Sequence, residues 1–317
     1  MARVVVVHGI GQEFAGPERM RTAVVRALAE GFRAAGLTSP HAGRAARDAG
    51  DVACAYYADL YAEPGTRSAD ALPPWDETDV EQGLEAALLG AWCREAETTD
   101  ASGRDISYPG DTSDSSGMRG LFRGDPSGRP DPSDGAVPRE LRSRLIRQGL
   151  DTLAGSPYFD GAPIRLVVHA LKQFSRYLAE PELRAAAQAR LEERIGPDTR
   201  VVVAHSLGSL IAYETLCARP DLPVTELITL GSPLGMPTIL DRVSPRPAPG
   251  TAPWPGTIRH WTNVTDRGDL VAVPGPLAPR FGPAVTDLRI DAGARLHGLA
   301  RYLSAPETAA AIARGRA

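Results

Sequence analysis

Short apolar runs alternate along this chain with segments of helical periodicity. The runs at 3–7 and 201–204 are continuous and rich in β-branched residues, as in parallel strands that are covered on both faces. Further strands are expected at 51–57, 226–230, 258–264 and 285–290. An amphipathic helix is expected at 18–35, and further helices are expected at 79–92, 139–153, 164–178 and 181–195. This alternation predicts an α/β fold with a mostly parallel central sheet and helices on both faces.

The pattern breaks between residues 60 and 138. Residues 98–138 are dense in Gly, Ser, Asp and Pro and contain too few apolar residues to offset the entropy of ordering them. We therefore expect one domain over residues 1–317, with 60–138 as an insertion within it. A passive loop and a cap over a functional site are equally compatible with this composition.

One stretch, RVVVAHSLGSLIAYETLC at 200–217, places Ser206 at a turn between a buried strand and a helix. The small residues Ala204 and Gly208 allow a turn tight enough to lift the Ser206 hydroxyl above the sheet. The start of the helix would point its free N–H groups at the same place. This geometry suits a nucleophile that faces a developing oxyanion. The alternative is an ordinary strand-to-helix turn in which Ser206 caps the helix.

The AHSLG sequence resembles the nucleophile elbow, G-x-S-x-G, of the α/β-hydrolase fold, with Ala204 at the first glycine position. HGIGQ at 8–12 is similar to the oxyanion loop of lipase-like members, in which the residue after HG donates a backbone N–H. The resemblance implies an oxyanion hole formed by the N–H groups of Ile10 and Leu207. A phosphate-binding loop is the alternative, but HGIGQ lacks the third glycine of G-x-G-x-x-G and no P-loop lysine follows it.

The resemblance also assigns the other members of a catalytic triad. This fold has its acid in a loop after the strand expected at 258–264, commonly as D-x-V, and Asp269 fits that spacing; Asp266 is the alternative. His297 follows the last expected strand and is the only histidine after the candidate acid. Ser206, Asp269 and His297 therefore stand in the chain order of this fold.

Three other polar residues are weaker candidates for the site or are interpreted as structural. Ser232, in GSPLG, is a second candidate nucleophile, but it lacks small residues on both sides and a following helix. His8 lies on the strand side of its loop and is interpreted as a hydrogen-bonding residue. His169, within an expected helix, has no acidic partner in the nearby sequence and is interpreted as structural.

Composition narrows the function classes. A net charge of −4 and a pI near 5.9 give no support for nucleic-acid binding. No apolar run approaches the ~20 residues that span a bilayer, and the N-terminus enters a strand directly, so a cytoplasmic location is expected. Three widely spaced cysteines indicate neither a disulfide framework nor a zinc site. No metal or organic cofactor is implied.

The sequence thus predicts a serine hydrolase of the lipase or esterase type, similar to the trimmed lipases or lipid deacylases. It would cleave a small-molecule or lipid carboxylic ester through an acyl-enzyme intermediate. A thioesterase or lipid-anchor deacylase, and a non-catalytic interaction or signalling module with the same fold, are the alternatives. Acyl length, oligomeric state and any protein partner are left open.

Overall fold

A computed structural model describes residues 2–37, 51–62, 72–101, 139–155, 163–246, 252–266, 276–291 and 298–316. Its centre is a six-stranded sheet with the order β2-β1-β3-β4-β5-β6, in which every neighbouring pair is parallel. The strands are β1 (Val4–Val7), β2 (Val52–Ala55), β3 (Val201–His205), β4 (Glu226–Leu230), β5 (His260–Asp266) and β6 (Val285–Ile290). The predicted α/β fold with a parallel sheet is confirmed.

The valines of β1 show why the central strands read as continuous apolar runs. All four are buried, and successive side chains enter opposite faces of the sheet. Val5 and Val7 join one hydrophobic cluster, whereas Val4 and Val6 join another. A strand covered on both faces has no solvent-facing position, so it carries no polar alternation.

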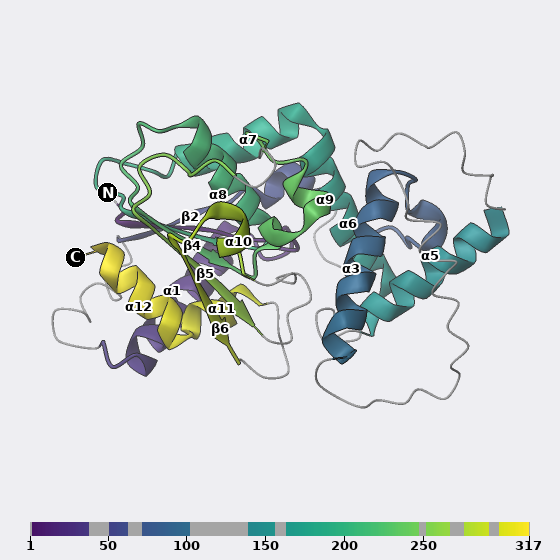
Figure 1. Cartoon of the computed structure of the whole chain (residues 1–317), viewed down its shortest axis with the longest axis horizontal. Helices are drawn as coiled ribbons and strands as arrows, with labels where there is room; N and C mark the ends of the chain where they lie inside the picture. Colours follow the sequence, from purple (N-terminus) through teal and green to yellow (C-terminus); the bar gives the residue numbers. More distant parts are fainter. Residues whose placement is uncertain are drawn as a thin grey trace.

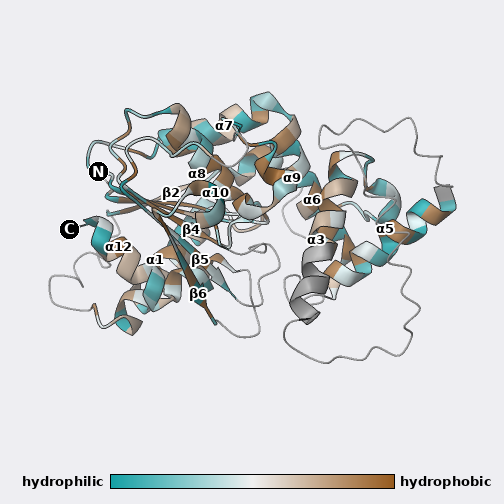
Figure 2. Ribbon diagram, in the orientation of Figure 1, coloured by the Kyte–Doolittle hydropathy of each residue, from teal (hydrophilic) through white to brown (hydrophobic). Residues whose placement is uncertain are grey.

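Helices cover both faces, as Figure 1 shows. One face is covered by α1 (Pro17–Ala34), α11 (Leu299–Ser304) and α12 (Pro306–Arg316). The helices of the other face are α6 (Ile164–Ala179), α7 (Pro181–Glu192), α8 (Leu207–Ala218), α9 (Pro237–Leu240) and α10 (Ala278–Phe281). Short 3₁₀ turns are η1 (Ala58–Tyr61), η3 (Glu77–Asp79) and η4 (Pro233–Gly235). In Figure 2 the hydrophobic colouring follows the strands and the helix surfaces that meet them.

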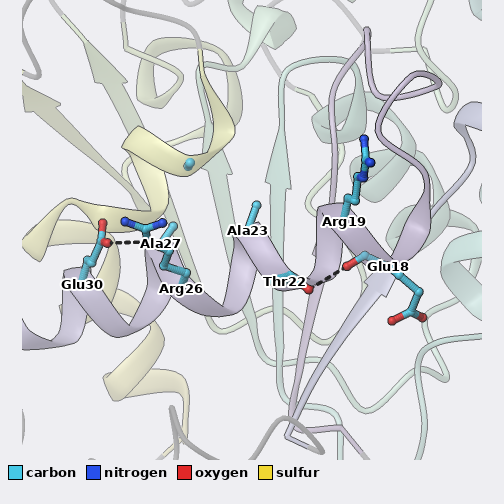
Figure 3. Close-up of a pocket in the computed structure, with 8 residues that line it drawn as sticks. Glu18, Arg19, Thr22, Ala23, Arg26, Ala27 and Glu30 are labelled. Carbon is cyan, nitrogen blue, oxygen red and sulfur yellow. Dashed lines mark hydrogen bonds and ion pairs between the residues drawn. The ribbon is translucent and has the colours of Figure 1, made fainter. Parts of the chain in front are cut away.

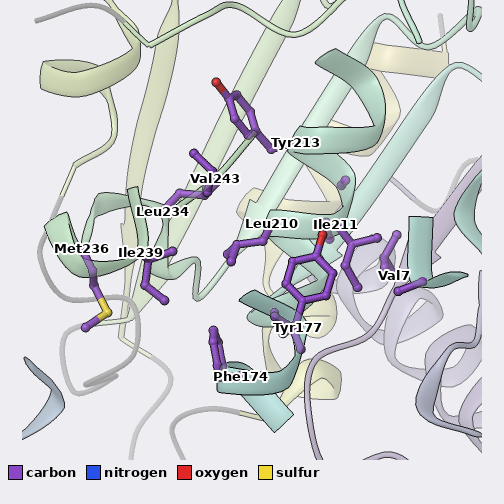
Figure 4. Close-up of a cluster of buried hydrophobic side chains, with 14 of the residues drawn as sticks. Val7, Phe174, Tyr177, Leu210, Ile211, Tyr213, Leu234, Met236, Ile239 and Val243 are labelled. Atoms are coloured by element: carbon purple, nitrogen blue, oxygen red, sulfur yellow. The ribbon is translucent and has the colours of Figure 1, made fainter. Parts of the chain in front are cut away.

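A helical lobe stands beside the sheet, made of α3 (Leu84–Ala101), α5 (Arg139–Ala154) and part of α6 (Figure 1). The Trp92 ring meets the Phe174 ring edge-on with 5.4 Å between centroids. Phe174 in turn belongs to the cluster that contains Leu210 of α8 and Leu234 (Figure 4). The lobe is therefore continuous with the main core. Residues 63–71 and 102–138 lie outside the described part of the chain, so the cap stays a prediction.

Strand β5 ends later than the sequence pattern predicts. The expected strand stops at residue 264, but pairing with β6 extends it to Asp266, which is in register with Ile290. Asp266 is buried at this last strand position. It is consequently a sheet residue and not part of the following loop.

Candidate active site

Ser206 occupies a strained turn between β3 and α8. Its φ of 52° and ψ of −124° make it the only non-glycine residue with a positive φ in the described part of the chain. Such backbone costs on the order of 1–3 kcal/mol and is found mainly at functional sites. The Ser206 N–H donates to the carbonyl of Leu230 at 3.0 Å, which ties the turn to the neighbouring strand. The predicted strand, turn and helix around Ser206 are confirmed.

Small residues on both sides of Ser206 are required by packing. A β-carbon on Gly208 would overlap the carbonyl oxygen of His8 and lie 2.9 Å from that of Val7. Ala204 is completely buried within β3. Helix α8 therefore starts directly against the end of β1, which only a glycine at position 208 allows.

The hydroxyl of Ser206 is fully buried and makes no hydrogen bond within the described residues. It forms no capping bond to α8, so the helix-cap alternative is wrong. Most buried polar groups are hydrogen-bonded, and each exception calls for an explanation such as a catalytic role.

The expected oxyanion loop follows β1, which pairs directly with β3. A β-carbon on Gly9 would lie 2.7 Å from the Ser206 β-carbon and 2.8 Å from Nδ1 of His205. Ile10 is the next residue and packs against the core. On the other side of Ser206, Leu207 is the first residue of α8, so its N–H has no acceptor within the helix. Gly9 and Leu207 thus lie on either side of the serine, and the predicted donor Ile10 follows Gly9 in the chain.

His8 fastens the start of this loop. Its Nε2 accepts from the Tyr57 N–H at 3.1 Å, so the ring proton is on Nδ1, which donates to the Gly9 carbonyl at 2.6 Å. The Tyr57 hydroxyl donates to the His8 carbonyl at 2.9 Å, and the two rings stack with 4.0 Å between centroids. Burial lowers the pKa of His8 to about 4. The structural interpretation of His8 is confirmed.

The two remaining predicted triad residues, Asp269 and His297, lie outside the described residues. The alternative acid, Asp266, donates its N–H to the hydroxyl of Tyr302 at 3.2 Å. The Tyr302 ring, on α11, lies 5.8 Å from the His205 ring, centroid to centroid. Tyr302 therefore lies between the strand that leads to the serine and the end of β5.

Asp287 of β6 anchors the chain where it returns from the region of Asp269. Its carboxylate accepts from the N–H groups of Leu277 and Ala278 at 2.8 and 2.9 Å, and from Nδ2 of Asn263 at 2.9 Å. Sequence reasoning missed this role. The only signal was an acidic residue within a strand pattern. An aspartate at such a position is equally expected on an edge strand that faces solvent.

The interpretations of Ser232 and His169 have different outcomes. Ser232 is buried, and its Oγ accepts from the Leu234 N–H at 3.3 Å, which caps η4. This bond gives Ser232 a structural role. His169 does have an acidic partner, because its Nε2 pairs with Glu13, which lies 156 residues earlier in the chain. Local sequence could not reveal a pair that the tertiary fold creates.

A groove of about 620 Å³ runs along the outer side of α1 (Figure 3). Its lining includes the exposed ion pair of Arg26 and Glu30, with 3.1 Å between Nε and Oε1. Ala300 of α11 closes one side. None of the residues around Ser206 lines this groove.

Within the described residues, no group of three or more His, Cys, Asp or Glu side chains is placed to hold a metal ion. No helix in the same part of the chain combines the length and apolar character needed to cross a membrane. The parallel sheet with Ser206 at its carboxyl edge is consistent with an α/β-hydrolase-like fold. Comparison of the chain with protein-family models, curated protein sequences and solved structures finds no match.

Proposed function

We propose that this protein is a serine hydrolase that cleaves carboxylic esters, with Ser206 as its nucleophile. The observation that carries the proposal is the buried, strained Ser206 whose hydroxyl has no partner among the described residues. Its β-carbon lies against Gly9, in a loop whose next residue is a candidate oxyanion donor. Strain and an unsatisfied hydroxyl in one residue are explained together by a catalytic role.

The reaction follows from the chemistry of the assigned groups. His297 would take the proton of Ser206 as the Oγ attacks the ester carbonyl, and Asp269 would hold the imidazole in the required tautomer. The N–H groups of Ile10 and Leu207 would stabilise the oxyanion, each contributing roughly 3 kcal/mol to transition-state stabilisation. His297 then protonates the leaving alcohol, and water activated by the same imidazole releases the acid from Ser206.

The topology supports this assignment. Ser206 follows β3, the segment that contains Asp269 follows β5, and the segment that contains His297 follows β6. Because the sheet is entirely parallel, these three strands end at the same edge. Asp266 is kept as the alternative acid, since it is buried at the end of β5.

The same chemistry would act on thioesters, so a thioesterase or lipid-anchor deacylase lies within this proposal. No observation favours a non-catalytic module. The cytoplasmic location, the lack of nucleic-acid partners and the lipid or small-molecule ester substrate stay predictions.

The deciding experiment is labelling with a fluorophosphonate probe, followed by mass-spectrometric mapping of the adduct. Wild type should carry the adduct on Ser206, and Ser206→Ala should carry none. Ser232→Ala is the matched control, because Ser232 is also buried beside the carboxyl edge but caps η4; it should label like wild type. A folded wild-type protein without an adduct, or an adduct on another residue, contradicts the proposal. A labelled protein should then be assayed on esters of increasing acyl length.

A further inference from the structure

A buried chain of polar side chains connects the loop after β1 to helix α6. The N–H of Gly11 donates to Oε1 of Gln173 at 3.1 Å. Nε2 of Gln173 lies 3.1 Å from Nε2 of His169, and His169 pairs with the carboxylate of Glu13. Glu13 belongs to the same loop as Gly11, so α6 holds this loop at two points.

The surroundings of Gln173 fix the orientation of its amide. Gln173 is 3% exposed. Its Oε1 accepts from the Gly11 N–H, and its NH₂ group lies toward Nε2 of His169, 3.1 Å away. Because a backbone N–H donates but cannot accept, the carbonyl end of the amide must face Gly11.

Glu13 and His169 form a second buried contact between the loop and α6. The Glu13 and His169 side chains are 4% and 9% exposed. Burial alone would raise the pKa of Glu13, but the hydrogen bond and the charge of His169 outweigh it, and the pKa is lowered. Trp75 stacks on the His169 ring with 5.4 Å between centroids. The Glu13 carboxylate therefore binds the loop to α6 through His169.

Ile10 lies between the two fixed points of its loop. On one side Gly9 packs against Ser206, and on the other Gly11 is bound by Gln173. Gly11 has a φ of +78°, which a glycine adopts without strain. The direction of the Ile10 N–H thus depends on contacts made by both neighbouring residues.

We propose that Gln173 is a positioning residue for the oxyanion hole, which holds the Ile10 N–H toward the oxyanion formed at Ser206, while the pair of Glu13 and His169 ties the same loop to α6. This inference rests on the proposed function, because it concerns the same site. It makes helix α6, which also packs against α3 and α5, part of the catalytic framework. Donors of this kind lose effect when they are displaced by about 1 Å.

Gln173→Met tests the inference, because it keeps the length of the side chain and removes the acceptor for the Gly11 N–H. We expect kcat on a small ester and the rate of fluorophosphonate labelling to fall ~10- to 100-fold, with KM changed less than about threefold. Hydrogen exchange in a peptide spanning 9–13 should become faster. Ser175→Ala is the matched control, since it removes a 3.1 Å bond from the same helix to Glu85 and leaves the loop contacts intact.

Each outcome has a defined meaning. A wild-type protein that neither labels nor hydrolyses esters overturns the proposed function, and this inference falls with it. An active wild type whose Gln173→Met variant keeps its kcat, or shows unchanged exchange at 9–13, overturns the inference alone. If Gln173→Met does not fold, Glu13→Gln decides, because it removes the charge that pairs with His169 and so weakens the second contact between the loop and α6; kcat should again fall with KM nearly constant, and an unchanged kcat overturns the inference.

Discussion

A β-carbon on Gly9 would lie 2.7 Å from the β-carbon of Ser206. The two residues come from motifs that are far apart in the chain and meet because β1 and β3 pair in parallel, with Val7 in register with Ala204. Each motif alone describes a glycine-rich turn after a buried strand. Their contact places a candidate oxyanion donor beside a candidate nucleophile, which is the arrangement that acyl transfer needs.

The first prediction concerns the fit between α8 and β1. Gly208→Ala would force a β-carbon into the carbonyl oxygen of His8, and backbone atoms there cannot rotate away. We expect the free energy of unfolding to fall by about 1–3 kcal/mol, despite the better helix propensity of alanine. Labelling of Ser206 should fall as well, because the elbow must shift.

Urea unfolding measures this change. Gly298→Ala serves as the control, since a β-carbon there meets no atom of the described residues within 4 Å and the φ is −76°. Equal stabilities for the two variants would contradict the packing argument.

The second prediction identifies the triad acid. Asp269→Asn should lower kcat by ~10⁴ by favouring the wrong imidazole tautomer, with little change in the unfolding midpoint. Asp266→Asn alters a buried residue at the end of β5 and should act mainly on stability. Steady-state kinetics and unfolding of both variants separate the roles, and a larger loss of kcat in Asp266→Asn would make Asp266 the acid. His297→Ala should abolish turnover in a folded protein.

The third prediction is a pH dependence of stability set by His8. Burial lowers its pKa from near 6.5 to about 4. His8 becomes protonated below pH ~6.5 in the unfolded chain but only below about pH 4 in the folded protein. Between these two values the unfolded state binds more protons, so stability falls as the pH falls through this window. The full effect is about 3 kcal/mol.

Urea unfolding at about pH 7 and about pH 5 measures the loss of stability. Both pH values lie above the range in which most carboxylates titrate, so carboxylate titration contributes little to the difference. An NMR titration of the His8 ring gives the direct check. A ring that titrates near its ordinary value would contradict the buried, neutral His8.

The fourth prediction concerns a buried charge on the elbow helix. Glu214 pairs with Arg184 and accepts from the Tyr177 hydroxyl at 2.5 Å, from Nε2 of Gln188 at 3.0 Å and from the Ser244 N–H at 2.9 Å. Arg184→Met would leave this carboxylate without its cation, at a cost of about 3–5 kcal/mol of stability.

Thermal or urea unfolding measures that cost. A second variant that also carries Glu214→Gln should recover part of the loss, because no buried charge then remains and the amide oxygen can still accept from the remaining donors. Arg147→Met is the control; its ion pairs with Glu77 and Asp151 are at the surface, and we expect no measurable shift of the midpoint. An Arg184→Met variant as stable as the wild type would contradict the destabilisation expected from an unpaired buried Glu214.

Much of the fold could be predicted because strand and helix periods are local properties of a sequence. The runs of valine in β1 and β3 indicated buried parallel strands, and Ala204 and Gly208 indicated a tight turn around Ser206. Element ends were less certain, because they depend on pairing. Asp266 joins β5 only because β6 lies beside it.

The sequence by itself determined the succession of strands and helices and the place of Ser206 at a tight turn. Those features follow from side-chain periodicity and from the space available to Ala204 and Gly208. Only the tertiary structure decided that Gly9 packs on Ser206, that Gln173 holds Gly11, and that His169 pairs with Glu13. These contacts join residues distant in the chain, and strand order and helix packing, which no local pattern encodes, bring them together.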